Sequence, residues 1–312
     1  MSAPEGAHRP SGGERGSRSA HRAPERLLHR LEWQVVRRLE GQLPAAHRAR
    51  AYGAGLDVAD LRAYVPGDDV RHIDWNVTAR LDEPHVRRYT EDRDITAWLL
   101  VDRSASMAFG PSGRGKDVVM AELATALASV LVRRGNRVGA ILYDRTVERT
   151  IPPRTGRAHV LRMAHELMRP PPGDGGATDL SGLLQAAQGT LKRRSLVFLL
   201  SDFLSAPGWE RRLGDLARRH ELVAIQVVDP LEGELPDVGL IVVQDAETGE
   251  QVLVDTSDPV FRGRLEQVAR DREAALLAST SHAGVDLYRL STDEDVATAL
   301  VRMVRDRAAR AR

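Results

Sequence analysis

The sequence predicts an α/β fold built on a doubly wound, mostly parallel sheet, and two observations support this prediction. From Thr96 onward, short apolar stretches typical of strands alternate with longer stretches of helical periodicity, as expected for βαβ units. The chain is 42% apolar with 4% aromatic residues, which indicates a core made mainly of Leu, Val and Ala. Its 312 residues are enough to bury such a core.

The individual elements follow from their apolar patterns and from the Gly and Pro residues between them. We expect strands over residues 97–101, 137–143, 147–151, 196–200, 222–228 and 286–290. We expect helices over residues 116–133, 157–168, 180–191, 209–219, 260–282 and 293–310. Residues 240–254 predict a hairpin inserted near one edge of the sheet, with Glu247-Thr248-Gly249-Glu250 as its turn.

The N-terminal third differs in character. Residues 1–25 are rich in Gly, Ser, Arg and His and lack an apolar h-region, so we expect a disordered tail and no secretion signal. Leucine and valine then recur at helical spacing, which predicts an amphipathic helix over residues 25–43. Residues 52–94 are punctuated by Gly and Pro and crowded with charge. The predicted parts are a tail, a helix with a small strand-containing charged module, and the α/β domain: residues 1–25, 26–94 and 95–312.

Composition excludes several classes of function. A formal net charge of +1 provides no overall field for binding nucleic acid or an anionic membrane. The absence of cysteine excludes disulfides, thiolate zinc sites and a cysteine nucleophile. The longest apolar runs, residues 97–101 and 196–200, are far shorter than the roughly 20 residues that a membrane-spanning helix needs. We therefore expect a cytoplasmic protein with no nucleic-acid partner and no membrane insertion.

Side chains that carry oxygen atoms follow two of the predicted strands and precede one of the predicted helices. A ligand of this fold would bind at these positions. Asp102, Ser104 and Ser106 follow strand 97–101, Asp202 follows strand 196–200, and Thr178 precedes a helix. Ligands of open α/β sheets bind outside the carboxyl ends of the strands, and carboxylate and hydroxyl oxygens suit Mg²⁺ or Mn²⁺ rather than zinc. The alternative is structural: the serines cap the next segment, and Asp202 opens the next helix.

Two stretches resemble known families. Asp102-Arg103-Ser104-Ala105-Ser106, together with Thr178 and Asp202, resembles the metal-ion-dependent adhesion site of von Willebrand factor A domains, which are Rossmann-type α/β folds. Upstream, residues 55–75, with Val65-Pro66-Gly67-Asp68-Asp69 at their centre, and residues 78–93 resemble domain-of-unknown-function family 58. The combined resemblance covers about residues 27–205.

The resemblance implies a function in binding rather than catalysis. It implies that Asp102, Ser104, Ser106, Thr178 and Asp202 hold Mg²⁺ (or Mn²⁺) and that an acidic side chain of a partner protein completes the coordination. Family members are commonly encoded beside MoxR-type AAA+ ATPases, which implies an adaptor or co-chaperone of such an ATPase in protein maturation. Longer members carry amino-terminal membrane helices. This sequence shows none, so membrane localisation is not carried over.

The charged module offers a second candidate surface. Arg71, Asp74, Trp75 and Arg80 are candidate partner-binding residues, because exposed ion pairs add little stability and a dense cluster of them needs another explanation. The alternative is that these residues dock the module on the α/β domain, with Trp75 as the anchor.

Two alternative interpretations of the sequence involve phosphate chemistry. Residues 110–117 nearly match the sequence motif of a phosphate-binding loop, but Asp117 occupies the position where such loops have Ser or Thr. We therefore expect a Gly-rich loop that leads into a helix with Lys116 near its start. A Mg²⁺-dependent phosphoesterase of haloacid-dehalogenase type is the alternative function. It would need an acid two residues after Asp102, where the chain has Ser104.

Overall fold

The computed structural model describes residues 58–65, 68–70, 73–81, 83–89, 96–110, 114–170, 179–244 and 250–310. They belong to two compact units, a smaller one within residues 39–94 and a larger one that includes residues 95–312. The tail and the helix expected over residues 25–43 lie outside the described residues, as do Arg71 and Thr178.

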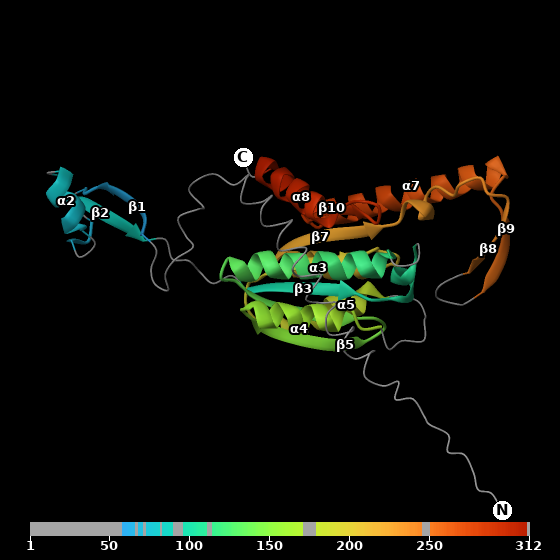
Figure 1. The fold of residues 1–312 in the computed structure, drawn as a ribbon, viewed down its shortest axis with the longest axis horizontal. Coiled ribbons are helices and arrows are strands. Elements are labelled where there is room, and N and C mark those ends of the chain that lie inside the picture. Colours follow the sequence, from blue (N-terminus) through green and yellow to red (C-terminus); the bar gives the residue numbers. More distant parts are fainter. Residues whose placement is uncertain are drawn as a thin grey trace, which may run out of the picture. The chain divides into compact units, whose positions relative to one another are not determined.

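The smaller unit is a two-stranded antiparallel sheet with one short helix. Strand β1 (Val58–Ala63) pairs with β2 (His85–Tyr89), and helix α2 (Trp75–Leu81) lies between them in the chain (Figure 1). The Tyr64 amide donates to the Pro84 carbonyl at 2.7 Å, and the His85 amide donates to Thr78 Oγ1 at 3.1 Å. These bonds tie the helix and the turn after it to the sheet.

The larger unit is built on a six-stranded sheet with the order β10-β7-β6-β3-β4-β5. Every neighbouring pair is parallel except β4 and β5, which are antiparallel. The sheet is therefore mostly parallel, as predicted. Its strands are β3 (Thr96–Asp102), β4 (Arg137–Tyr143), β5 (Val147–Arg154), β6 (Leu196–Ser201), β7 (Glu221–Val228) and β10 (Asp286–Ser291).

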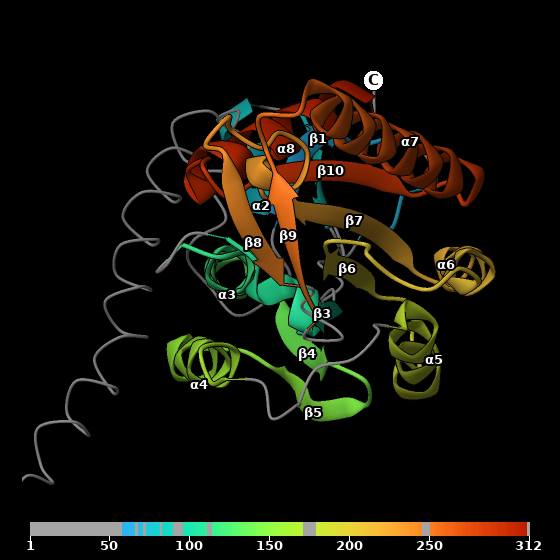
Figure 2. The same ribbon diagram turned by 90° about the vertical axis from the view of Figure 1, so that its right-hand side faces the viewer.

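Helices cover both faces of this sheet (Figure 2). One face carries α3 (Lys116–Arg133), α4 (Arg157–Leu167) and α8 (Val296–Arg310). The other face carries α5 (Leu180–Thr190), α6 (Trp209–Ala217) and α7 (Pro259–His282). The predicted doubly wound α/β class is confirmed, and so is each helix and strand predicted from residue 96 onward. Within the described residues, no helix combines the length and the apolar character needed to cross a bilayer.

Two element ends differ from the predictions for identifiable reasons. Strand β5 runs on to Arg154, which pairs with Val138, because Pro152 and Pro153 are tolerated in a strand at the edge of a sheet. Helix α8 begins at Val296 because the Asp295 carboxylate accepts a hydrogen bond from the Thr298 amide at 2.9 Å. Such a cap fixes where a helix starts.

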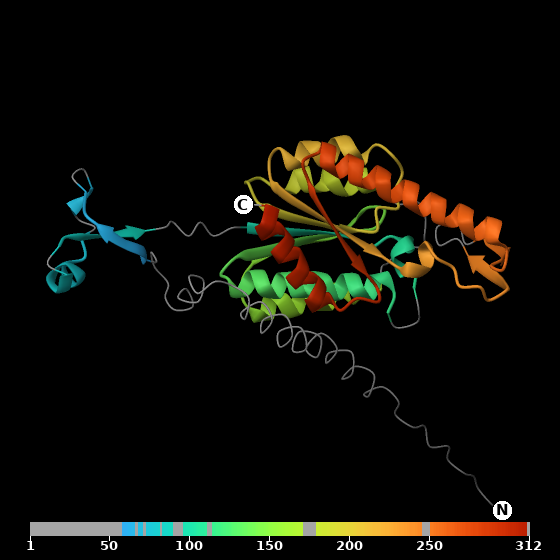
Figure 3. The ribbon, with the colours of Figure 1, turned by 90° about the horizontal axis from the view of Figure 1, so that it is seen from above.

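The predicted hairpin is present and forms a sheet of its own. Strands β8 (Leu240–Gln244) and β9 (Gln251–Asp255) pair antiparallel, between β7 and α7 in the chain; part of the predicted turn, residues 245–249, lies outside the described residues. Figure 3 shows the hairpin at the end of the larger unit where α7 begins, toward which the parallel strands point. Leu240, Val242 and Leu253 are each more than 60% exposed.

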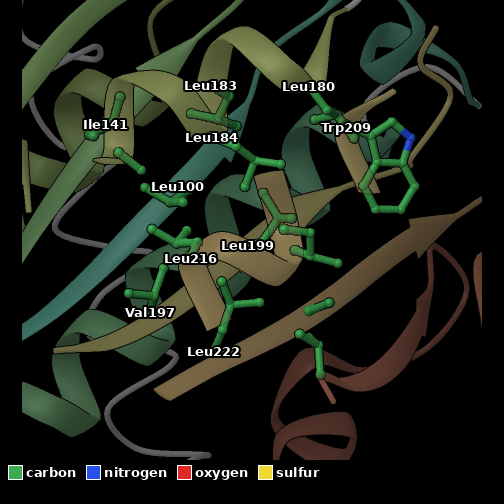
Figure 4. Close-up of a cluster of buried hydrophobic side chains, with 14 of the residues drawn as sticks. Leu100, Ile141, Leu180, Leu183, Leu184, Val197, Leu199, Trp209, Leu216 and Leu222 are labelled. Atoms are coloured by element: carbon green, nitrogen blue, oxygen red, sulfur yellow. The ribbon is translucent and has the colours of Figure 1, made fainter. Parts of the chain in front are cut away.

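The core lies where helices α5 and α6 pack on the middle of the sheet (Figure 4). It consists mainly of aliphatic side chains, such as Leu100 and Leu199 from neighbouring strands and Leu183 and Leu216 from the two helices, with Trp209 at one end. Both β3 and β6 are buried along almost their entire length. A strand covered on both faces needs a continuous apolar sequence, which is why these two runs were recognisable in the sequence.

Two glycines of helix α5 should respond to alanine in opposite directions. A Cβ on Gly182 would lie 2.0 Å from the Tyr143 hydroxyl, whereas a Cβ on Gly189 meets nothing within 4 Å. We expect Gly189→Ala to stabilise the protein by about 0.5–1 kcal/mol through helix propensity. Gly182→Ala should destabilise it by about 1–3 kcal/mol, because Tyr143 must move. Urea unfolding of the two variants measures both effects, and equal effects would contradict this packing.

Candidate metal centre

The candidate site lies at the point where the chain reverses its direction of travel across the sheet. Strands β3 and β6 are neighbours, but the chain proceeds from β3 to β4 on one side and from β6 to β7 on the other. Connections that diverge in this way leave a crevice at the carboxyl ends of the two strands. Asp102 is the last residue of β3, and Asp202 directly follows β6. Two acidic residues a hundred positions apart are thereby brought together.

Asp102 is held rigidly by its neighbours. The Ser104 amide donates to Asp102 Oδ1 at 3.0 Å, and the Ser201 hydroxyl donates to Oδ2 at 2.6 Å. The side chain is almost completely buried, with 1% of its surface exposed. Ser201 in turn accepts a hydrogen bond from the Phe203 amide at 2.8 Å. The two strand ends are therefore joined through this carboxylate.

The pKa of Asp102 is raised to about 6, from an ordinary value of 3.8. Burial is the largest cause and the nearby Asp202 carboxylate is the second, whereas the hydrogen bonds from Ser201 and Ser104 act in the opposite direction. The charged form of Asp102 is thus insufficiently compensated by the protein. A cation placed against this carboxylate would supply the missing compensation.

The two serine hydroxyls lie side by side. Ser104 Oγ and Ser106 Oγ are 3.0 Å apart, and both residues are buried. Ser104 precedes the short helix η3 (Ala105–Ala108), but its side chain makes no capping hydrogen bond, which argues against a capping role. Two ligands about 2.1 Å from Mg²⁺ on adjacent octahedral vertices would be about 3 Å apart. The two hydroxyls are hydrogen-bonded to each other, and their spacing is also compatible with such an ion.

Asp202 has a cationic partner that the sequence analysis missed. Lys116 Nζ donates to Asp202 Oδ2 at 2.6 Å, and the Leu204 amide donates to Oδ1 at 2.9 Å. Asp202 does not open a helix, since α6 begins only at Trp209. Phe203, the residue that follows it, has a left-handed backbone with φ of 60°, an uncommon conformation outside glycine that marks a constrained turn.

Lys116 is the first residue of α3 and is completely buried. Its ammonium also pairs with Glu232 in the short helix η4 (Pro230–Glu232), and it lies 5.9 Å from the centre of the Phe109 ring. Burial alone would lower the pKa of Lys116, but Asp202 and Glu232 outweigh burial and raise it. The side chain is therefore a charged ammonium between two carboxylates.

Glu232 is oriented by a capping box. Its Oε2 accepts a hydrogen bond from the Asp229 amide at 3.3 Å, while the other oxygen, Oε1, pairs with Lys116. Asp229 is itself fixed, because Thr292 Oγ1 donates to its Oδ2 at 2.6 Å. The carboxylate that shares Lys116 is thus part of a connected network that reaches Thr292, the residue directly after β10.

Arg103 points away from the site and anchors its loop. Its guanidinium forms a salt bridge with Glu148 of β5 at 3.0 Å, and both side chains are about nine-tenths buried. It also donates to the carbonyl oxygens of Glu166, in the last turn of α4, and of Arg169, which follows this helix. The contacts of Arg103 with β5 and with the end of the α4 region therefore hold the backbone that carries Ser104 and Ser106.

A cavity of about 660 Å³ adjoins the site. Its lining includes Ser106, Asp202 and Glu232 and, from α7, Arg272 and Ser279. This size is sufficient for a side chain or a small peptide segment to enter. Of the predicted ligands that the structure describes, Ser106 and Asp202 therefore line this cavity, whereas Asp102 and Ser104 are buried and are not part of its lining.

Four of the five predicted metal ligands can be placed. Asp102, Ser104, Ser106 and Asp202 gather at the switch point, and Thr178 lies outside the described residues. Among the described residues, no group of three or more His, Cys, Asp or Glu is arranged to hold a metal. The donor chemistry still fits Mg²⁺ at Asp102 and the two hydroxyls, because such an ion accepts neutral oxygen ligands and water. Asp202 is paired with Lys116, so its carboxylate would have to leave this ion pair to bind a metal.

The candidate residues of the charged module have more ordinary surroundings. Asp74 is buried, and its Oδ1 accepts a hydrogen bond from the Val77 amide at 3.2 Å at the start of α2. Trp75 is 69% exposed, and Arg80 lies in the last turn of α2. Asp74 therefore has a structural capping role, whereas partner binding by Trp75 and Arg80 remains a prediction.

The fold and the site together define a doubly wound α/β protein with a constrained, oxygen-lined centre at its switch point. The chain belongs to the family described as "Protein of unknown function DUF58", whose model matches residues 60–275. It is 37% identical to the uncharacterized protein Rv1480 of Mycobacterium tuberculosis and to Mb1516 of Mycobacterium bovis. Each match spans 281 residues, 90% of this chain and 88% of the relative.

Among solved structures, the chain is similar to the conserved hypothetical protein BatB from Bacteroides thetaiotaomicron. The TM-score is 0.46 and the identity 13%, over 69% of this chain and 99% of that one.

Proposed function

We propose that this protein is a non-enzymatic, metal-dependent protein-binding module of the von Willebrand factor A type. The observation that carries the proposal is the arrangement at the switch point, where an incompletely compensated Asp102 lies beside a hydroxyl pair 3.0 Å apart. Asp102, Ser104 and Ser106 would hold Mg²⁺, with Thr178 and Asp202 completing the set. The ion would supply an electrophilic position for a carboxylate of the partner.

The surroundings of the site suit a protein partner. The cavity beside the site reaches Gln244 at the end of β8, and the β8–β9 hairpin exposes several large apolar side chains. Exposed apolar patches next to a polar centre are typical of protein interfaces. Following the family resemblance, we propose that the partner is a MoxR-type AAA+ ATPase or its client and that the encounter takes place in the cytoplasm.

Affinity capture from a lysate of the source organism tests this proposal. Wild-type protein serves as bait in Mg²⁺ or in EDTA, and Asp102→Asn serves as a folded bait with an altered site. We expect an AAA+ ATPase or a client protein to be captured by the wild-type bait in Mg²⁺ only, and by Asp102→Asn in neither buffer.

Other outcomes would contradict the proposal. Capture of the same partners in EDTA would mean that binding does not need the metal. Mg²⁺-dependent hydrolysis of a generic phosphate ester, lost in Asp102→Asn, would instead establish the phosphoesterase alternative.

A further inference from the structure

The buried Lys116 is the feature of the larger unit that a simple metal site does not explain. Its ammonium contacts Asp202, one of the proposed ligands, at 2.6 Å, and neither side chain is more than 1% exposed. The same ammonium pairs with Glu232, whose side chain is 26% exposed. A buried cation already neutralises the carboxylate that an incoming metal would use.

The choice of lysine is itself informative. Lys116 and Lys192 are the two lysines of the chain, and its other basic residues, out of a total of 45, are arginines. An ammonium is a compact point charge, whereas a guanidinium is broad and planar. The position between Asp202 and Glu232 is therefore filled by the side-chain cation that most resembles a small metal ion in size and charge density.

We propose that Lys116 is a tethered cation that competes with Mg²⁺ for Asp202 and so sets the metal affinity of the site. This inference rests on the proposed function. In the metal-free protein the ammonium pairs with both carboxylates. When Mg²⁺ engages Asp202, the ammonium withdraws and keeps Glu232, which the capping box holds in place. Glu232 is thus the anion that allows Lys116 to release Asp202.

The proposal predicts opposite effects for two substitutions. Lys116→Met replaces the side chain with an unbranched apolar one that is one atom shorter and removes the competing charge, so the affinity for Mg²⁺ should rise about tenfold or more. Glu232→Gln leaves the ammonium with Asp202 as its one carboxylate partner, so the affinity should fall about tenfold. Lys192→Met is the matched control, because Lys192 is exposed, and its affinity should equal that of the wild type.

Titration of the full-length protein with Mn²⁺, followed by electron paramagnetic resonance of the free ion, and calorimetric titration with Mg²⁺ measure these affinities. Thermal unfolding provides a second measure. Lys116→Met should melt at least about 5 °C lower than the wild type in EDTA, because two carboxylates lose their counterion. Millimolar Mg²⁺ should restore most of that loss. The double variant Lys116→Met with Asp102→Asn should lose this rescue, which would locate the ion at this site.

The outcomes separate this proposal from the one it rests on. If Lys116→Met binds the metal no more tightly than the wild type, and Mg²⁺ does not restore its stability, Lys116 is a structural ion pair and the competition is wrong while the metal site stands. If Glu232→Gln binds more tightly than the wild type, the role given to Glu232 is wrong. If neither the wild type nor any variant binds either metal, the proposed function fails as well.

Discussion

Replacing Asp102 with Asn is expected to make the metal-free protein more stable and at the same time to remove its response to Mg²⁺. The asparagine can keep both contacts of Asp102: its carbonyl oxygen can accept from the Ser104 amide, and its amide can donate to the Ser201 hydroxyl. What it removes is a buried charge that the protein compensates poorly. Loss of function and gain of stability should therefore occur together.

The pH dependence of this effect follows from the raised pKa. An aspartate with a pKa of about 6 in the folded protein and 3.8 as its ordinary value binds its proton more tightly when folded. Its contribution to stability is most favourable below pH 3.8 and is lost as the pH rises through 6. The difference between these two pKa values corresponds to a free energy of about 3 kcal/mol. The advantage of Asp102→Asn should thus be small near pH 4 and reach up to about 3 kcal/mol above pH 7.

Urea unfolding in EDTA at pH 5 and pH 8 measures this difference. Asp117→Asn, at an exposed acidic residue in the first turn of α3, is the control and should change the free energy of unfolding by less than about 0.5 kcal/mol. If Asp102→Asn unfolds at a lower urea concentration than the wild type at pH 8, the charged carboxylate stabilises the metal-free site. The account of its pKa would then be wrong.

Leu199→Ala is expected to cause a large loss of stability without altering the site directly. Leu199 lies in the middle of β6, is fully buried, and is paired in register with Leu100 and Ala224. Helix α5 packs on the same cluster through Leu183 and Leu184. Truncation leaves a cavity between two covered layers that cannot close easily, and we expect a loss of about 2–5 kcal/mol.

Leu277→Ala provides the comparison, since Leu277 of α7 is 56% exposed. Its free energy of unfolding should change by no more than about 0.5 kcal/mol. The folded fraction of Leu199→Ala should still bind Mn²⁺ with wild-type affinity. The substitution leaves the candidate ligands at the ends of β3 and β6 unchanged. A loss of less than about 1 kcal/mol would show that the core around β6 is more adaptable than its burial indicates.

The sequence by itself determined the α/β class and the order of the elements from residue 96 onward. Strands β3 and β6 are buried on both faces, so they are continuous apolar runs, while helix α3 begins after a Gly-rich loop and keeps helical periodicity to Arg133. These are local signals, because each depends on the burial of a short segment. The expected positions of Asp102, Ser104, Ser106 and Asp202 at strand ends followed from the same signals.

The tertiary structure alone decided which charges meet at the switch point. Lys116 is 86 residues from Asp202 and 116 from Glu232, and no local pattern records that pairing. Lys116 lies in a stretch that nearly matches a phosphate-binding loop, and this match drew attention away from its pairing with the two carboxylates. The scarcity of lysine in an arginine-rich chain was the one signal in the sequence that could have pointed to Lys116. Periodicity reports how a segment is buried, whereas the partners of a buried charge depend on strand order, which the packing of the whole sheet sets.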